Sequence, residues 1–249
     1  TTGASNTALG HAALLANTTA ANNTAVGYGS LDANTTAANN TALGYNSLTA
    51  NTTGINNTVI GSLAGDANTT GHYNVALGTL SLSANTTADG NTAVGYAALT
   101  GNTTGAGNVA IGREALGAST TGNYNIALGS YALDANVTAH RSTAIGYEAL
   151  TASNVSGNSN TANTAVGFQA GLSATTAINS VFVGTSAGDA VTTGSGNVAM
   201  GVNSLGATDD GARNVAVGYL TLSGNCGDEN TAVGTQCLSV TTGANNTGL

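Results

Sequence analysis

The chain has 249 residues, a net charge of −8 and 6% charged residues, against roughly 25% in ordinary globular domains. Lysine, proline and tryptophan are absent, and the only basic side chains besides histidine are Arg113, Arg141 and Arg213. Three distant cations cannot form a phosphate-binding patch, so we expect no nucleic-acid partner. No apolar run approaches the ~20 residues of a membrane span, so we expect no membrane insertion within this segment.

A five-residue word, most often Asn-Thr-Ala-aliphatic-Gly, recurs every 17 residues from Asn6 onward. One repeat is longer by four residues and two are shorter by one. The chain begins and ends in mid-pattern, so we interpret residues 1–249 as a single repeat array within a longer chain. The fourteen predicted coils start at Asn6, Asn23, Asn40, Asn57, Asn74, Asn91, Asn108, Asn125, Ser142, Asn163, Ser180, Asn197, Asn214 and Asn230.

Each coil is numbered here from its first residue as positions 1 to 17. Glycine, asparagine and β-branched threonine disfavour a helix, and the first five positions alternate as a short strand does. The Ala/Ser-Leu pair at positions 8 and 9 predicts a second short strand, and positions 12 to 15 predict a turn. One coil cannot bury its own apolar residues, so we predict stacking at about 4.8 Å. The predicted class is all-β, a parallel β-solenoid or β-roll.

Alternation along the strand places positions 2 and 4 on one side and positions 3 and 5 on the other. Position 4 is aliphatic or Met in every coil, and this even spacing indicates a packed interior with position 2 half-buried beside it. Positions 3 and 5 are almost always Ala and Gly, so another backbone can approach that face closely. The neighbour is either the opposite wall of the same coil or a second chain on a symmetry axis. We expect the asparagines at positions 1 and 12 to form structural ladders.

The word N-[T/V]-A-[V/I/L]-G-x-x-[A/S] resembles the head repeat of trimeric autotransporter adhesins, N-S-V-A-I-G-x-x-[S/A]. The longer form NTAVGYAALTGNTTGAGN, from Asn91 to Asn108, is similar to repeats of bacterial surface proteins and phage tail-fibre proteins. The resemblance covers essentially the whole chain. It implies a parallel β-roll, often trimeric, that projects from a surface and binds matrix, host or neighbouring cells. The coil is longer than the adhesin-head coil, and trimerisation and attachment rest on the analogy.

These observations predict a non-enzymatic structural or adhesive segment of an extracellular fibre, at a cell surface or on a virion. The expected partners are further copies of the chain, as a homotrimer or end to end, and a host or cell surface, matrix or glycan. One alternative is an ice-binding β-solenoid, although valine and isoleucine interrupt the threonine column at position 2. Another is a subunit of a self-assembling filament, because an open coil end is an unpaired edge.

No catalytic site and no cofactor are predicted. His72 and His140 are four coils apart, about 19 Å by stacking, and cannot share a metal. A uniform repeat also lacks the unique concave site that catalysis needs. A weak calcium site is predicted where two adjacent turns bring acids together, with solvated turn acids as the alternative. Its residues are Asp209, Asp210, Asp228 and Glu229.

The two cysteines lie in consecutive coils. Cys226 falls at turn position 13 and Cys237 at position 8 of the next coil. They either form a disulfide that staples a short coil or remain free thiols.

Aromatic residues recur at position 6, directly after the glycine. They either bind a sugar or a partner surface, or cap the core. They are Tyr28, Tyr45, Tyr96, Tyr147 and Tyr219, with Phe168. A further surface feature is the four-residue insertion near residues 154–160, which is a recognition candidate. The Asn-x-Thr sequons at position 12, such as Asn17-Thr18-Thr19, are either acceptors for N-glycosylation in a secretory pathway or turns only.

Overall fold

The computed structural model describes residues 2–154 and 160–249. In these residues the regular structure is entirely β: fifteen short parallel strands about 17 residues apart, in a β-solenoid of about fourteen turns. The predicted all-β class and parallel tandem repeat are therefore confirmed. By compactness the chain divides into two units, residues 1–124 and 125–249.

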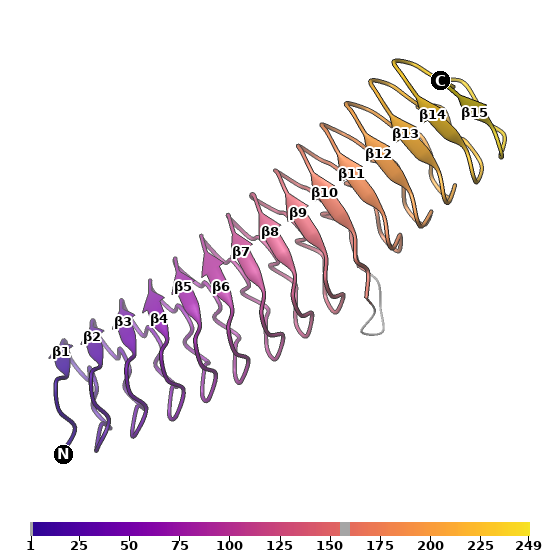
Figure 1. The fold of residues 1–249 in the computed structure, drawn as a ribbon. Coiled ribbons are helices and arrows are strands. Elements are labelled where there is room, and N and C mark those ends of the chain that lie inside the picture. The colour runs from indigo at the N-terminus through magenta and orange to yellow at the C-terminus, as the bar shows by residue number, and fades with distance from the viewer. Residues whose placement is uncertain (1, 155–159) are drawn as a thin grey trace. The chain divides into compact units, whose positions relative to one another are not determined.

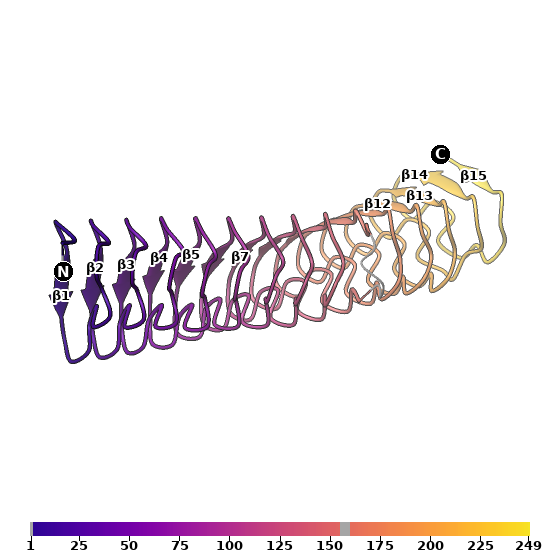
Figure 2. The same cartoon turned by 90° about the horizontal axis from the view of Figure 1, so that it is seen from below.

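The first unit has one strand per coil, and each strand pairs in parallel with the next (Figure 1). The pairing register follows the repeat, so that Ala25 lies beside Ala42. Seen from below, strands β1 to β5 lie side by side along one wall of their coils (Figure 2). The strands are β1 (Thr7–Leu9), β2 (Thr24–Val26), β3 (Thr41–Leu43), β4 (Thr58–Ile60), β5 (Val75–Leu77), β6 (Thr92–Val94) and β7 (Val109–Ile111).

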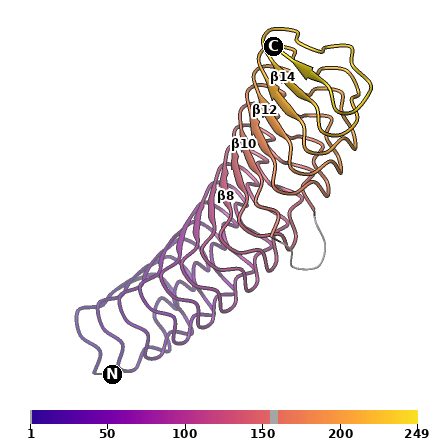
Figure 3. The ribbon, with the colours of Figure 1, turned by 45° about the vertical axis from the view of Figure 1, so that its right-hand side comes forward.

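The second unit keeps the same register although its coils vary in length. Figure 3 shows its strands β8, β10, β12 and β14 following one another along the unit. Ile145 pairs with Val166 across the insertion, and Val217 pairs with Val233 across a 16-residue coil. The differences in length are therefore absorbed in the turns. The strands are β8 (Ile126–Leu128), β9 (Thr143–Ile145), β10 (Thr164–Val166), β11 (Val181–Val183), β12 (Val198–Met200), β13 (Val215–Val217), β14 (Thr231–Val233) and β15 (Thr247–Gly248).

The second strand predicted at positions 8 and 9 is wrong, because this segment is a series of turns. Position 9 is left-handed, as at Leu48 (φ 52°) and Leu99 (φ 52°), and position 7 is left-handed at Ala97 (φ 53°). Left-handed backbone is unfavourable for a residue with a Cβ. Here it turns the leucine side chain into the coil, where Leu48 and Leu99 are fully buried. Burial of a leucine, worth about 1.5–3 kcal/mol, offsets that strain.

Glycine is required at position 5 because of the backbone conformation there and the close backbone of the next coil. Gly95 has φ +133°, a region that only glycine occupies readily, and a Cβ placed there would lie 2.5 Å from the carbonyl oxygen of Gly112 in the next coil. Because that neighbour is backbone, it cannot move aside without breaking the stack.

The core of each unit consists mainly of alanine and leucine side chains, with Val59 in the first unit and Phe182 and Val191 in the second, and not of the position-4 aliphatic residues. The alanines at position 3, such as Ala42 and Ala93, are completely buried with the position-9 leucines. The expectation of an aliphatic interior at position 4 is therefore wrong, because Leu43 is 43% exposed. Of the two alternatives for the alanine face, the opposite wall of the same coil is the one found.

The predicted asparagine ladders are confirmed. At position 1, the Asn91 carboxamide oxygen accepts the backbone N–H of Asn108 (2.9 Å), and its Nδ2 donates to the Gly105 carbonyl (2.9 Å). At position 12, Asn85 donates to Asn68 (2.7 Å) and accepts from Asn102 (3.0 Å). These buried amides satisfy one another and the turn carbonyls, which makes them structural.

Candidate functional site

The first candidate surface is the outward strand face, defined as the side chains at positions 2 and 4. In the first unit Leu43 and Ile111 are 43% and 41% exposed, and in the second unit Ile145 and Met200 are 38% and 43% exposed. No coil carries a charged residue at either position. A sheet face that meets water is normally polar, whereas here position 4 is apolar in every coil and position 2 is Thr in eight coils and Val or Ile in six. The aliphatic row at position 4 is therefore unusual for a surface.

Backbone groups contribute little to what this face can bind. The strands of each unit already pair with their neighbours, as β3 pairs with β2 and β4. The turns pair between coils as well, for example through Leu48 N–H and the Ala64 carbonyl at 3.0 Å. A partner on this face would therefore bind through apolar side-chain contact rather than by adding a strand.

The second candidate surface is the aromatic row, defined as the aromatic side chains at position 6. In the first unit the His11 and Tyr28 rings stack with centroids 5.1 Å apart, and Tyr28 and Tyr45 follow at 5.6 Å. In the second unit Tyr147 and Phe168 stack at 5.5 Å. The rings are nearly parallel, with interplanar angles of 10–17°.

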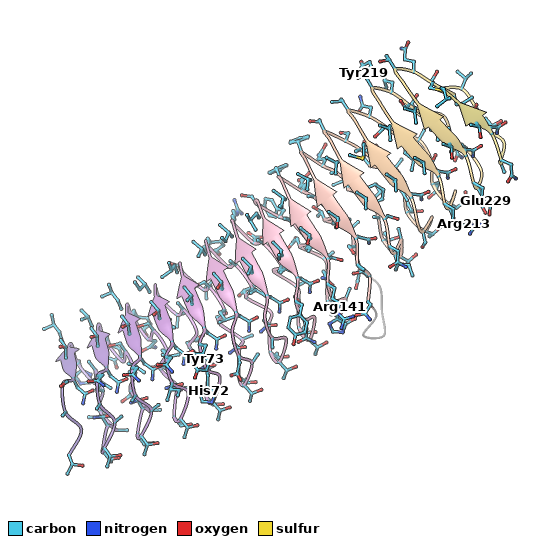
Figure 4. The ribbon with its side chains drawn as sticks, viewed as in Figure 1. His72, Tyr73, Arg141, Arg213, Tyr219 and Glu229 are labelled. Atoms are coloured by element: carbon cyan, nitrogen blue, oxygen red, sulfur yellow. The ribbon has the colours of Figure 1, made fainter. Side chains whose placement is uncertain are left out.

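The side chains of the aromatic row are about half exposed. Tyr28 and Tyr45 are each 52% exposed, and the isolated Tyr96 and Tyr219 are similar. In the second unit, Figure 4 places Tyr219 on the side to which the strand arrowheads point and Arg213 with Glu229 on the side where the strands begin. Binding and capping of the core both remain interpretations of these half-exposed side chains.

Two of the four acids predicted to hold calcium, Asp228 and Glu229, pair with an arginine. Arg213 Nε lies 2.9 Å from an oxygen of Glu229, which is near it in Figure 4. Its terminal nitrogen lies 3.3 Å from an Asp228 oxygen. Asp209 accepts a hydrogen bond from Thr192. In the described residues no three acidic, histidine or cysteine side chains gather as metal ligands would, and the calcium site stays a prediction from the sequence. The sequence signal missed was Arg213, one coil away in the same turn column.

The two cysteines are free thiols, so the disulfide alternative is not realised. Cys226 is buried, with its sulfur 3.1 Å from the hydroxyl of Thr208 in the preceding coil. The thiol thus points into the coil rather than standing in an exposed turn. Cys237 is half-buried at position 8, beside Gly248.

Two half-buried carboxyls were not singled out from the sequence. Burial raises the pKa of Asp66 and of Asp189 above the ordinary value of 3.8, although backbone hydrogen bonds act in the other direction. Each follows a glycine at position 9, Gly65 or Gly188, and this Gly-Asp pair is the signal that marks them. The buried Asp189 Oδ1 has no hydrogen-bond partner in the described residues.

Exposure of the sequons differs from the expectation. The position-12 asparagines, such as Asn34 and Asn51, are completely buried in their ladder. In the folded chain these asparagines are therefore not accessible for N-glycosylation. The Asn-Asn-Thr sequons at position 17 instead present Asn22 and Asn39 to solvent. Residues 155–159 of the predicted recognition insertion lie outside the described residues.

Among residues 2–154 and 160–249, no helix has the length and apolar character needed to cross a membrane. No protein-family model matches the chain, and no curated protein matches it.

Proposed function

We propose that this chain is a non-enzymatic structural or adhesive segment of an extracellular fibre, and that its copies associate as a homotrimer through the outward strand face. The observation that carries the proposal is this uncharged face in both units with its exposed aliphatic row at position 4, for example Leu43 and Ile145. Exposed apolar surface that extends over many coils costs free energy in water, and a partner that covers it removes that cost.

A second copy of the chain fits this face because its own outward strand face has the same regular spacing of side chains. Side chains recur at about 4.8 Å along each solenoid, so the rows of one copy can interdigitate with those of another in many successive coils. The absence of charge from positions 2 and 4 removes the usual obstacle to like-with-like packing. The number three comes from the resemblance to adhesin heads. The buried position-3 alanines cannot form the axis, so the aliphatic rows take that place.

The proposed setting is a cell surface or a virion fibre, where length and regularity are themselves the function. A host or cell surface, matrix or glycan is the proposed external partner, without a cofactor and without nucleic acid. End-to-end contact between copies is a further proposed mode, because the outermost coil of a solenoid has an unpaired edge.

Light scattering on a sizing column tests the assembly. We expect a mass near three times 23.8 kDa for the chain. Replacing Leu43→Asp together with Ile60→Asp should lower it to the monomer mass, since buried unpaired charges oppose association. The matched control, Thr36→Asp with Thr53→Asp, adds the same charge in exposed turns and should leave the mass unchanged.

A wild-type monomer would overturn the proposed assembly. In that case the outward strand face would be free in solution, and the alternative function, ice binding, would be tested by a thermal-hysteresis assay on the same sample.

A further inference from the structure

We propose that the aromatic row of the first unit, centred on Tyr28 and Tyr45, binds a neutral, extended β-linked polysaccharide that lies along the stacking direction. This inference rests on the proposed adhesive function and names the ligand class and the residues. The row is a good candidate because it combines large exposed side chains with a spacing set by the fold.

The spacing suits a linear ligand with a repeat of its own. Centroids along the row are separated by 5.1 Å from His11 to Tyr28 and by 5.6 Å from Tyr28 to Tyr45. A β-1,4-linked glycan in its extended form advances by a comparable length with each sugar. Successive sugars can therefore meet successive rings without bending either partner, and each added contact makes the next one intramolecular.

The chemistry of tyrosine suits a pyranose. Because the rings stack on one another along the row, ring edges and phenol hydroxyls are the groups open to a ligand, and these can contact the C–H groups and hydroxyls of a sugar. Tyr28 and Tyr45 are each 52% exposed, so about half of each side chain is open to a ligand. Stacking against a neighbouring ring holds each tyrosine in place, so less side-chain freedom is lost on binding.

Charge selects among glycans. The net charge is −8, and the first unit has one arginine, Arg113, whose guanidinium pairs with Glu114. A sulfated or uronic glycan would meet repulsion rather than steering. The expected ligand is therefore neutral, as in chitin-like or cellulose-like chains.

The two units should differ in affinity. In the second unit the corresponding stack is Tyr147 with Phe168, and phenylalanine has no hydroxyl to donate. The first unit offers two consecutive tyrosines and the ring of His11. We therefore assign the stronger site to the first unit.

Titration of the full chain with chitohexaose and with cellohexaose tests the inference, by calorimetry and by tyrosine fluorescence, which no tryptophan obscures. Tyr28→Ala with Tyr45→Ala should weaken binding by about tenfold or more. The matched control is Tyr73→Ala with Tyr124→Ala, which removes two tyrosines that are more exposed but lie at position 17. It should bind as the wild type does. Tyr28→Phe with Tyr45→Phe should fall between, because the rings remain.

Absence of binding to both hexasaccharides overturns the inference, and so does equal weakening by the control pair. A change of mass in the Tyr28/Tyr45 variant, without a change in sugar binding, also overturns it and assigns the row to contact between copies. Light scattering on the same samples separates the two proposals. A monomer that binds sugar refutes the assembly alone, and a trimer that binds neither sugar refutes this inference alone.

Discussion

The two units are built from the same coil but differ in how far the residue at position 12 departs from asparagine. In the first unit, position 12 is Asn in six successive coils, from Asn17 to Asn102, and the amides bond along the column. In the second unit the same column contains Ala174, Val191 and Thr208, all buried, and the strand register is unchanged. The position-12 ladder is therefore dispensable for stacking.

Position 1 behaves differently. It is Asn in twelve coils, and its two exceptions, Ser142 and Ser180, still supply an oxygen to the next backbone N–H. Where Ser180 lacks the donor of asparagine, Asn197 donates to both the Gly194 and the Gly211 carbonyls. Retention of the acceptor in every coil indicates that position 1, rather than position 12, holds the coils together.

The largest expected effect is in the core of the second unit. The Phe182 ring occupies the space of the leucines missing at Gly171 and Gly188, since a Cβ at Gly171 would lie 2.7 Å from that ring. Phe182→Ala should lower the free energy of unfolding by about 3–5 kcal/mol in a urea titration. Adding Gly188→Leu should recover part of the loss, because a leucine then refills the cavity.

The converse change in the first unit sharpens this comparison. Ala93 faces a coil that already contains Leu99, and both are fully buried. Ala93→Phe should therefore destabilise the chain by about 1–3 kcal/mol through overpacking. A neutral result at either site would contradict the view that positions 3 and 9 share one volume.

The next effect separates the two asparagine columns. Asn91→Ala leaves the buried Asn108 N–H without its acceptor and should cost about 1–3 kcal/mol in the same titration. Asn85→Ala should cost less, because the Asn102 amide keeps its bond to the Gly105 carbonyl. Asn91→Ser should lie close to the wild type, as Ser180 does naturally. Equal losses at Asn91 and Asn85 would refute the greater importance of position 1.

The smallest expected effect depends on pH. The folded pKa of Asp189 lies above 3.8, so the folded chain holds that proton more tightly than the unfolded chain. Stability should then fall as pH rises from about 3.8 through the folded pKa, and remain lower above it. Asp189→Asn should raise Tm at pH 7 and change little at pH 3. Asp66→Asn should act in the same direction but less strongly, since only Asp189 has an orphaned oxygen. A variant that gains stability only at pH 3 would contradict the sign.

Periodicity was sufficient to predict the solenoid, its parallel register and the asparagine ladders, because each depends on spacing alone. Alternation identified which residues share a face but not which face is interior. That choice depends on the left-handed backbone at Leu48 and Leu99, which sends leucines inward and leaves room only for alanine opposite. A leucine at positive φ has no local sequence signal. The pairing of Arg213 with Glu229 was missed because only the acids of these turns were considered, although stacking also brings Arg213 beside Glu229.

The hydrogen bonds between coils also have a mechanical consequence. Within each unit they join each coil to the next, so a pull along the stacking direction loads the bonds of the end coil before those behind it. Such a structure should peel one coil at a time rather than rupture as a whole. Each event would release 17 residues, roughly 55–60 Å of extended chain. Under load the repeat would thus dissipate work in equal steps, which appear as regular force peaks in a pulling experiment. The coil in which Phe182 replaces the missing leucines should give a peak of different height.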